Sequence, residues 1–127
     1  MSVNKVTLLG RVTKNPEIKN FDNGSLVTLT IVTGKKHTDP LTGEKKVKSQ
    51  FHRVVCKKSV ANYVSLYVKK GTLLYCEGYL NNTSWKNNEG KTQYSYEIVI
   101  DATGNIEIIN NGISRNDTNN FRNQVNC

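Results

Sequence analysis

Alternation of apolar and polar residues constrains the fold of this chain more than any other feature, because it recurs in five separate segments. In the first of them, Val6, Leu8 and Val12 share one face. A period of two residues is typical of strands that bury one side. Strands are therefore predicted over Val3–Thr13, Leu26–Thr33, Val47–Lys57, Thr72–Leu80 and Thr92–Asp101, and Ala102–Ile109 could extend the last.

Turn residues and polar segments separate these strands. Gly10, inside the first strand, predicts a bend or bulge of the kind that barrel strands need at corners. Asp22-Asn23-Gly24 predicts a hairpin turn, because Asn and Gly tolerate a positive φ. Gly34–Lys46 and Asn81–Lys91 are predicted to be polar loops, and the second contains Trp85.

Ser59–Lys70 is the one segment whose pattern favours a helix. Three of its valines are spaced four residues apart, which places them on one helical face. Ser59 is predicted as the N-cap, and Lys69-Lys70-Gly71 suits the end of a helix. Valine lowers helix propensity, so a strand is the alternative interpretation.

Five strands with one helix between the third and the fourth is the order of an OB-fold. The predicted fold class is therefore all-β, a five-stranded Greek-key barrel with one short helix between strands 3 and 4. A length of 127 residues fits one domain with a hydrophobic core. We expect this domain over residues 1–109. Residues 110–127 are rich in Asn and poor in large apolar residues, so a polar, disordered tail is expected there.

The chain is basic, with 18 Lys and Arg against 10 Asp and Glu and a formal net charge of +8. This excess favours a polyanion, which could be nucleic acid, an acidic membrane surface or an acidic protein. No apolar run approaches the roughly 18 residues of a membrane span, so no membrane partner is expected. Met1–Lys5 lacks the apolar stretch of a signal peptide, although a removed presequence stays an alternative.

Aromatic residues in polar surroundings favour single-stranded nucleic acid, whose bases can stack on them. Trp85 has only polar neighbours, so a stacking role is preferred over packing against the barrel. Phe51 shares a predicted face with Arg53, while the opposite face of that strand is apolar. His37, in the basic loop, could also stack.

Basic residues surround the same segments with little acidic compensation. Contacts with phosphate are predicted for this group, although each lysine alone could be a solvated surface charge. For the arginines, a surface ion pair is a further alternative. The residues predicted to bind single-stranded DNA are Trp85, Phe51, Arg53, Arg11, His37, Lys35, Lys36, Lys48, Lys57, Lys86 and Lys5.

No residue pattern predicts catalysis or a metal site. His37 and His52 are the only histidines, and neither has metal-ligand spacing or an adjacent nucleophile. Cys56, Cys76 and Cys127 are widely spaced, which predicts neither a disulfide framework nor a zinc site. We expect no enzyme activity, no cofactor and a reducing compartment. His52 is expected in the core or at a subunit interface.

The chain also carries an ordered set of short motifs, each weak alone but specific in this order and spacing. They are Val3-Asn4-Lys5-Val6, Leu9-Gly10-Arg11, Asn15-Pro16-Glu17, Thr42-Gly43-Glu44, His52-Arg53-Val54-Val55, Tyr67-Val68-Lys69-Lys70-Gly71, Tyr75-Cys76-Glu77-Gly78, Trp85, Gly90 and Tyr94 through Glu97. The set resembles the single-stranded DNA-binding (SSB) protein family of bacteria and mitochondria, from about Val3 to Ile109. The resemblance implies an OB-fold, a homotetramer and sequence-independent binding of single-stranded DNA in replication, repair and recombination.

The chain departs from the family pattern in two places. The resemblance implies aromatic stacking residues at His37, Phe51, Lys57 and Trp85, of which Lys57 is not aromatic and Phe51 replaces the more usual Trp. Bacterial members end in an acidic tip that recruits other proteins, whereas this chain ends in residues 122–127 without one. Recruitment through the tail is therefore doubtful. The expected location is a nucleoid, in the mitochondrial matrix or the bacterial cytoplasm. The missing acidic tip favours a mitochondrial-type protein, a divergent bacterial or mobile-element protein, or a truncated chain.

Two other functions stay open at this point. One is an OB-fold protein that binds RNA, which differs from DNA at each sugar by its 2′-hydroxyl. The other is an OB-fold structural or interaction module that no longer binds nucleic acid, since the set of stacking residues is reduced.

Overall fold

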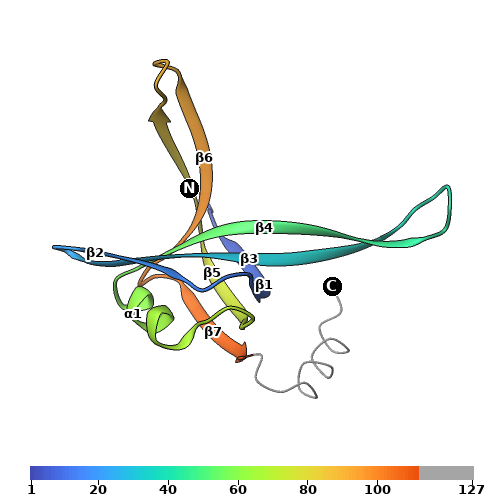
Figure 1. Cartoon of the computed structure of the whole chain (residues 1–127), viewed down its shortest axis with the longest axis horizontal. Helices are drawn as coiled ribbons and strands as arrows, with labels where there is room; N and C mark the ends of the chain where they lie inside the picture. The colour runs from blue at the N-terminus through green and yellow to red at the C-terminus, as the bar shows by residue number, and fades with distance from the viewer. Residues whose placement is uncertain (112–127) are drawn as a thin grey trace.

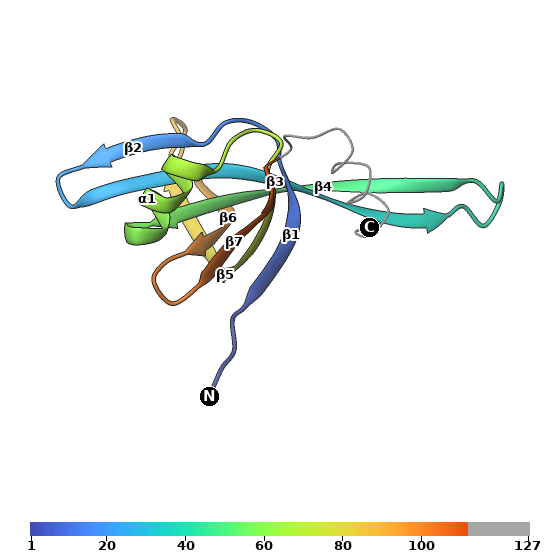
Figure 2. The ribbon, with the colours of Figure 1, turned by 90° about the horizontal axis from the view of Figure 1, so that it is seen from below.

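The computed structural model describes residues 1–111, which form a small barrel with hairpins that project from it in different directions (Figures 1 and 2). One short helix, α1, lies against the barrel beside β3 and β4. The elements are β1 (Val6–Val12), β2 (Glu17–Phe21), β3 (Gly24–Thr38), β4 (Lys45–Lys57), α1 (Lys58–Tyr67), β5 (Leu73–Lys86), β6 (Thr92–Ile100) and β7 (Asn105–Asn110).

Five of these strands close the barrel in the order β1-β3-β4-β6-β5, and β5 pairs with β1 again. Every neighbouring pair in the ring is antiparallel except β4 and β6, which run parallel because α1 and β5 come between them in the chain. The helix lies between the third and fourth barrel strands. This confirms the predicted OB-fold. Within residues 1–111, β2 and β7 are additional strands, and they pair with β3 and β5 outside the ring.

The core fills the barrel and is built from the inward-facing residues of alternating strands. On β3, Val27, Leu29 and Ile31 are fully buried, as the alternation predicts. The helix adds Ala61 and Val64 to the same cluster. The spacing of four residues in α1 therefore marks the face that packs on the barrel, as expected.

The helix is confirmed, but its predicted ends are wrong. It spans Lys58–Tyr67, and its N-cap is Lys57, whose side chain makes no capping hydrogen bond, so Ser59 is not the cap. β4 runs directly into the helix without a linker, which leaves no place for a capping residue at position 59. At the other end, Val68 has an extended backbone and is buried, so the chain turns back toward the barrel before the lysines.

The two predicted polar loops are largely strands. β3 and β4 stay paired out to Thr38 and Lys45, and form the β3–β4 arm (residues 33–50). Likewise β5 and β6 stay paired out to Lys86 and Thr92, and form the β5–β6 arm (residues 81–97). Both arms extend beyond the barrel, as Figure 1 shows. Neither face of Gly34–Lys46 or of Asn81–Lys91 is buried in the described structure, so these two segments lack the apolar alternation that identifies strands.

Gly10 lies where β1 passes between its two neighbours. β1 pairs with β5 as far as Arg11 and with β3 from Arg11 onward. A Cβ at Gly10 would lie 2.3 Å from the carbonyl oxygen of Val32. The close approach of two backbones therefore requires glycine at this predicted corner.

The hairpin predicted at Asp22-Asn23-Gly24 is present, with Phe21 paired to Gly24, whose φ is 130°.

The final strand differs from prediction, because β7 is separated from β6 by a turn and pairs with β5. β7 ends at Asn110, one residue beyond the predicted domain. From residue 112 onward the predicted tail lies outside the described residues.

Candidate nucleic-acid interface

The register divides the sheet into an inner face, which continues the barrel core, and an outer face. Residues directly opposed in an antiparallel pair point to the same side. Since Ile31 and Val54 are buried in the core, the outer face carries the even-numbered residues of β3 and the odd-numbered residues of β4. By the same argument, it carries the odd-numbered residues of β5 and β6, because Ile98 is also buried.

Phe51 lies on the outer face at the base of the β3–β4 arm. It is opposite Val32 on β3, and Val32 is opposite Arg11 on β1, so three strands place these side chains in one row. Nη1 of Arg11 donates a hydrogen bond to the carbonyl oxygen of Gly71 at 2.9 Å. This bond anchors a guanidinium that has further N–H donors, beside an aromatic ring that is 66% exposed.

Arg53 lies two residues along the same face and is tied to the second arm. Its Nε is 3.5 Å from Oε2 of Glu97 on β6, and Asn81 on β5 donates to Oε1 of Glu97 at 3.3 Å. The ion pair that the sequence left as an alternative for Arg53 is therefore present. An exposed pair of this kind contributes about 0–1 kcal/mol. The main effect of the ion pair is to hold the guanidinium of Arg53 where the two arms leave the barrel.

Trp85 lies on β5 in the β5–β6 arm, so its predicted position in a loop is wrong. It is opposite Gln93 on the outer face, the same face as Asn81 and Glu97, and it is 52% exposed. The outer face thus carries one exposed aromatic ring on each arm, with Arg53 at the junction between them.

The predicted lysines of the arms are divided between the two faces. Lys36 is opposite Val47 and shares the outer face with Phe51. Lys35 is directly opposite Lys48 on the other face of the arm, where His37 is opposite Lys46. Lys86 likewise lies on the opposite face of its arm from Trp85. An arm exposes both faces to solvent, so all these residues are accessible, but of the predicted lysines in the arms only Lys36 shares the outer face with Phe51 and Trp85.

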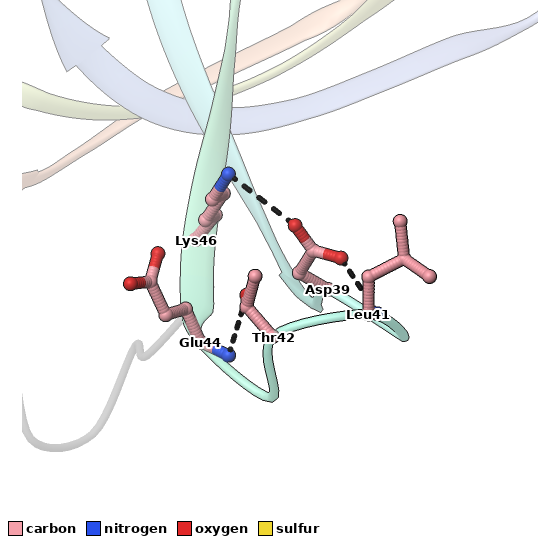
Figure 3. Close-up of polar contacts among 5 residues, drawn as sticks. All are labelled: Asp39, Leu41, Thr42, Glu44 and Lys46. Carbon is pink, nitrogen blue, oxygen red and sulfur yellow. Dashed lines mark hydrogen bonds and ion pairs between the residues drawn. The ribbon is translucent and has the colours of Figure 1, made fainter.

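Hydrogen bonds order the tip of the β3–β4 arm (Figure 3). Oδ1 of Asp39 accepts the backbone N–H of Leu41 at 2.9 Å, and Oδ2 lies 3.5 Å from Nζ of Lys46. The Leu41 N–H is the main reason that the pKa of Asp39 is lowered, and Lys46 adds to the effect. The charge of Lys46 is therefore partly compensated, in contrast to that of Lys48.

Lys57 and Lys5 lie apart from the arms. Lys57 is half-buried at the end of β4, opposite Leu26, on the outer face next to the β2–β3 hairpin (residues 17–28). Lys5 precedes β1, and its Nζ is 3.2 Å from Oε2 of Glu77 on β5. By the rise of a strand, Lys5 is about 20 Å from Arg11, so it is not part of the row formed by Phe51, Val32 and Arg11.

The buried titratable groups do not form a reactive centre. Nε2 of His52 is 2.8 Å from Oγ1 of Thr33. The thiols of Cys56 and Cys76 are unpaired and buried, and burial raises the pKa of each to about 12. Within residues 1–111, no group of three or more His, Cys, Asp or Glu could hold a metal ion. No helix in that part of the chain is long and apolar enough to cross a membrane.

Sequence reasoning missed three exposed aromatic residues on the strands. Tyr94 and Tyr96 lie on the same face of β6 as Ile98, but the arm carries them beyond the barrel, where that face is open. Phe21 was not assigned at all and lies exposed on β2. An isolated aromatic residue beside a hairpin turn, in a strand with no apolar alternation, was the signal that could have identified it.

Comparison with known proteins agrees with this geometry. Residues 3–109 match the single-strand binding protein family. The structure is similar to that of the Plasmodium falciparum SSB in complex with ssDNA, with a TM-score of 0.78 and 27% identity over 87% of this chain and 97% of that one. It also shares the fold of a deletion mutant of the single-stranded DNA binding protein from Thermus aquaticus, with a TM-score of 0.70 and 22% identity over 84% and 50% of the two chains. Since the matched region runs from before β1 into β7, the chain belongs to the single-strand binding protein family.

Proposed function

We propose that the chain binds single-stranded DNA along the outer face of its sheet, without sequence specificity and without catalysis. The observation that carries this proposal is the pair of exposed rings, Phe51 and Trp85, on one face with Arg53 held between them. Membership of the single-strand binding protein family supports it. We propose the family's role in replication, repair and recombination for this chain as well.

Stacking on the two rings explains why binding is tolerant of sequence. Every base has a π-face, and each stacked base contributes about 1–3 kcal/mol. Arg11 and Arg53 lie beside these rings, so their guanidinium groups can donate hydrogen bonds to the phosphates that link the stacked bases. Hydrogen-bond readout of base edges is not required.

The lysines of the β3–β4 arm supply a second, ionic part of the binding energy. Lys35 and Lys48 are directly opposed, and like charges in that position are destabilising. A phosphate that lies between two such ammonium groups removes their repulsion. The arm is therefore expected to bind the DNA backbone on the face that Phe51 does not occupy.

We also propose that the protein is a homotetramer. Tyr94 and Tyr96 are exposed on the inner face of the β5–β6 arm, where they continue the core face beyond Ile98, and the exposed Leu80 is opposite Ile98 at the start of the arm. Adjacent exposed apolar side chains often mark an interface between proteins. Burial of this face between copies would leave Trp85, on the other side of the arm, accessible to DNA.

We propose a nucleoid as the place of action, in the mitochondrial matrix or the bacterial cytoplasm, because the SSB family occurs in bacteria and mitochondria. Fluorescence microscopy of a tagged chain beside a DNA stain tests this. A signal that is spread evenly and excludes the DNA would contradict it.

Titration with oligo(dT) tests the proposed function. Trp85 is the only tryptophan of the chain, so its intrinsic fluorescence should be quenched as bases stack on it. Competition with poly(U) then separates DNA binding from RNA binding. Stronger competition by poly(U) than by poly(dT) would favour an RNA-binding protein. No quenching by either, with no shift in the anisotropy of a labelled oligonucleotide, would favour a module that does not bind nucleic acid.

A further inference from the structure

A pocket of about 360 Å³ lies where the tip of the β2–β3 hairpin meets the junction of β4 and α1. Phe21 and Leu26 give it an apolar side and Lys57 and Lys58 a basic wall, and residues 23–25 complete the lining. This volume lies within the range of small-molecule sites, which is about 300–1,000 Å³. The pocket is therefore large enough to hold one flat ring system.

The backbone of the hairpin keeps the space beside Phe21 open. Phe21 is 60% exposed and is opposite Gly24, which has no side chain. A Cβ at Gly24 would meet nothing within 4 Å. The ring of Phe21 thus has a face that no cross-strand side chain covers.

The basic wall has an unusual backbone. Lys58 has a φ of 59°, and within residues 1–111 no other residue except glycine has a positive φ. Such a conformation costs about 1 kcal/mol or more and is found most often at functional sites. It follows from the direct passage of β4 into α1, and it places two consecutive lysines at one edge of the pocket.

The two lysines of the pocket have no close carboxylate partner in the described part of the chain. Neither Lys57 nor Lys58 is among the residues that form ion pairs in the described part of the chain. Asp101 is held mainly by Thr103, whose hydroxyl is the leading cause of its lowered pKa, and Lys57 contributes least. Asp22, in the hairpin turn, is the acid closest in sequence to Phe21. The residues that line the pocket include two lysines and no acid, so the lining combines an exposed aromatic face with positive charge.

The pocket lies on the outer face, in line with the site described above. Rows of opposed residues on β3 and β4 lead along that face from Val32 and Phe51 to Leu26 and Lys57. Phe51 and Lys57 are six residues apart on one strand, or about 20 Å. This continuity favours a few more nucleotides of the same bound strand over an unrelated ligand.

We propose that this pocket is a third base-binding position, in which a nucleobase stacks on Phe21 while Lys57 and Lys58 hold the adjacent phosphates. The proposal rests on the proposed binding of single-stranded DNA, which it extends from the two arms to the β2–β3 hairpin. A strand that follows the outer face would then contact Trp85, Phe51 and Phe21 in turn.

Substitution of Phe21 provides the first test. We expect Phe21→Ala to weaken binding of a long dT oligonucleotide about tenfold, as measured by anisotropy of a labelled strand. Ile18→Ala is the matched control, because Ile18 lies on the same strand, is 49% exposed and does not line the pocket. Equal affinities for wild type and both variants, with unchanged circular dichroism, would overturn the proposal.

A relocated fluorophore provides the second test. In a Trp85→Phe background, Phe21→Trp makes the introduced tryptophan the only one in the chain, and oligo(dT) should quench it. Quenching by an acidic peptide such as poly-Glu, but not by oligo(dT), would assign the pocket to a protein partner and overturn the proposal. If oligo(dT) quenches Trp85 in the wild type but not the introduced tryptophan, the third position is wrong and the proposed function stands.

The roles of Lys57 and Lys58 are tested by the salt dependence of the DNA-binding constant K. Each phosphate contact on a single strand contributes about −0.7 to the slope of log K against log salt concentration. Lys57→Gln and Lys58→Gln should each flatten this slope by up to that amount. Unchanged slopes for both variants would show that neither lysine contacts phosphate.

Discussion

Trp85 is exposed although it belongs to a strand, because β5 has left the barrel before it reaches this residue. Its immediate neighbours on the outer face are small or polar, with Gln93 opposite and Thr83 two residues before it. A base can therefore approach the indole without displacing an apolar side chain. In the proposed complex, the favourable free energy at Trp85 would come from stacking, which depends little on salt.

Trp85→Ala is expected to weaken binding of oligo(dT) roughly tenfold or more, since a stacked base contributes about 1–3 kcal/mol. The measurement is anisotropy of a labelled oligonucleotide, with Ser84→Ala on the other face of the same strand as the control. Because Trp85 is outside the core, circular dichroism and thermal unfolding should not change. Equal affinity in the two variants would show that Trp85 does not stack on the DNA.

The two buried thiols give a prediction that does not depend on DNA. Burial raises the pKa of Cys56 and Cys76 from 9.0 to about 12, so folding favours their neutral form. Their contribution to stability is complete below the unfolded pKa and is lost as the pH rises from 9 toward 12. In a Cys127→Ser variant, a thiol reagent at pH 8 should modify neither cysteine in the native protein and both in urea. Rapid modification of the native variant would contradict the burial of these side chains.

At the scale of elements, alternation predicted every strand segment that encloses the core and missed most of the segments that do not. Leu26–Thr33 was found because β3 buries Val27, Leu29 and Ile31. The same strand continues to Thr38, where neither side is covered and no pattern marks it. Phe51 could be predicted as outward-facing from the apolar residues on the other side of β4. For Phe21, the position beside the hairpin turn was the one signal of exposure in the sequence, and the register that places it opposite Gly24 became known only from the structure.

Two lysines of the β3–β4 arm differ in charge compensation and provide a matched pair. Lys46 is paired with Asp39, whereas Lys48 is opposite the like charge of Lys35. We expect Lys48→Gln to flatten the slope of log K against log salt concentration by about 0.7, one phosphate contact on a single strand. Lys46→Gln should change it less, because its partner Asp39 already neutralises part of its charge. Equal changes would show that the register does not decide which lysines bind phosphate.

Gly10 is expected to be essential for the corner of the barrel. In Gly10→Ala the new Cβ would clash with the backbone oxygen of Val32, which cannot move without disturbing the β1–β3 pairing. Overpacking of this kind typically costs about 1–3 kcal/mol, measurable by urea unfolding. Gly34→Ala is the control, since its Cβ would meet only the side chain of Val47, at 3.0 Å. Equal stability of the two variants would contradict the close approach at Gly10.

At the scale of the whole molecule, the proposed assembly and the proposed DNA site use opposite faces of one arm. The tyrosines lie on the inner face and Trp85 on the outer face, and their separation follows from the alternation of side chains along β5 and β6. The sequence placed His52 in the core or at a subunit interface, and in the structure its Nε2 is 2.8 Å from Oγ1 of Thr33. The exposed tyrosines add a second candidate surface for subunit contacts, and their exposure could not be foreseen without knowing that the arm extends beyond the barrel.

Tyr96→Lys is expected to dissociate the proposed tetramer into smaller species, because it places a charge in an interface that would otherwise be apolar. Light scattering coupled to gel filtration at micromolar concentration measures the mass. Gln93→Lys on the outer face of the same strand should leave the mass unchanged. A wild-type protein that is monomeric under these conditions would contradict the tetramer itself.

The β3–β4 arm has a further consequence, for solubility. From Thr33 outward, β3 pairs only with β4, so each strand of the arm has one edge whose backbone N–H and C=O groups lack a strand partner within the described chain. Open edges of this kind promote association between chains, and lysine is the residue that most often prevents it. The lysines of the arm therefore also keep separate copies from joining edge to edge. Variants that neutralise several of them should precipitate more readily, and their DNA affinities are best compared at low protein concentration.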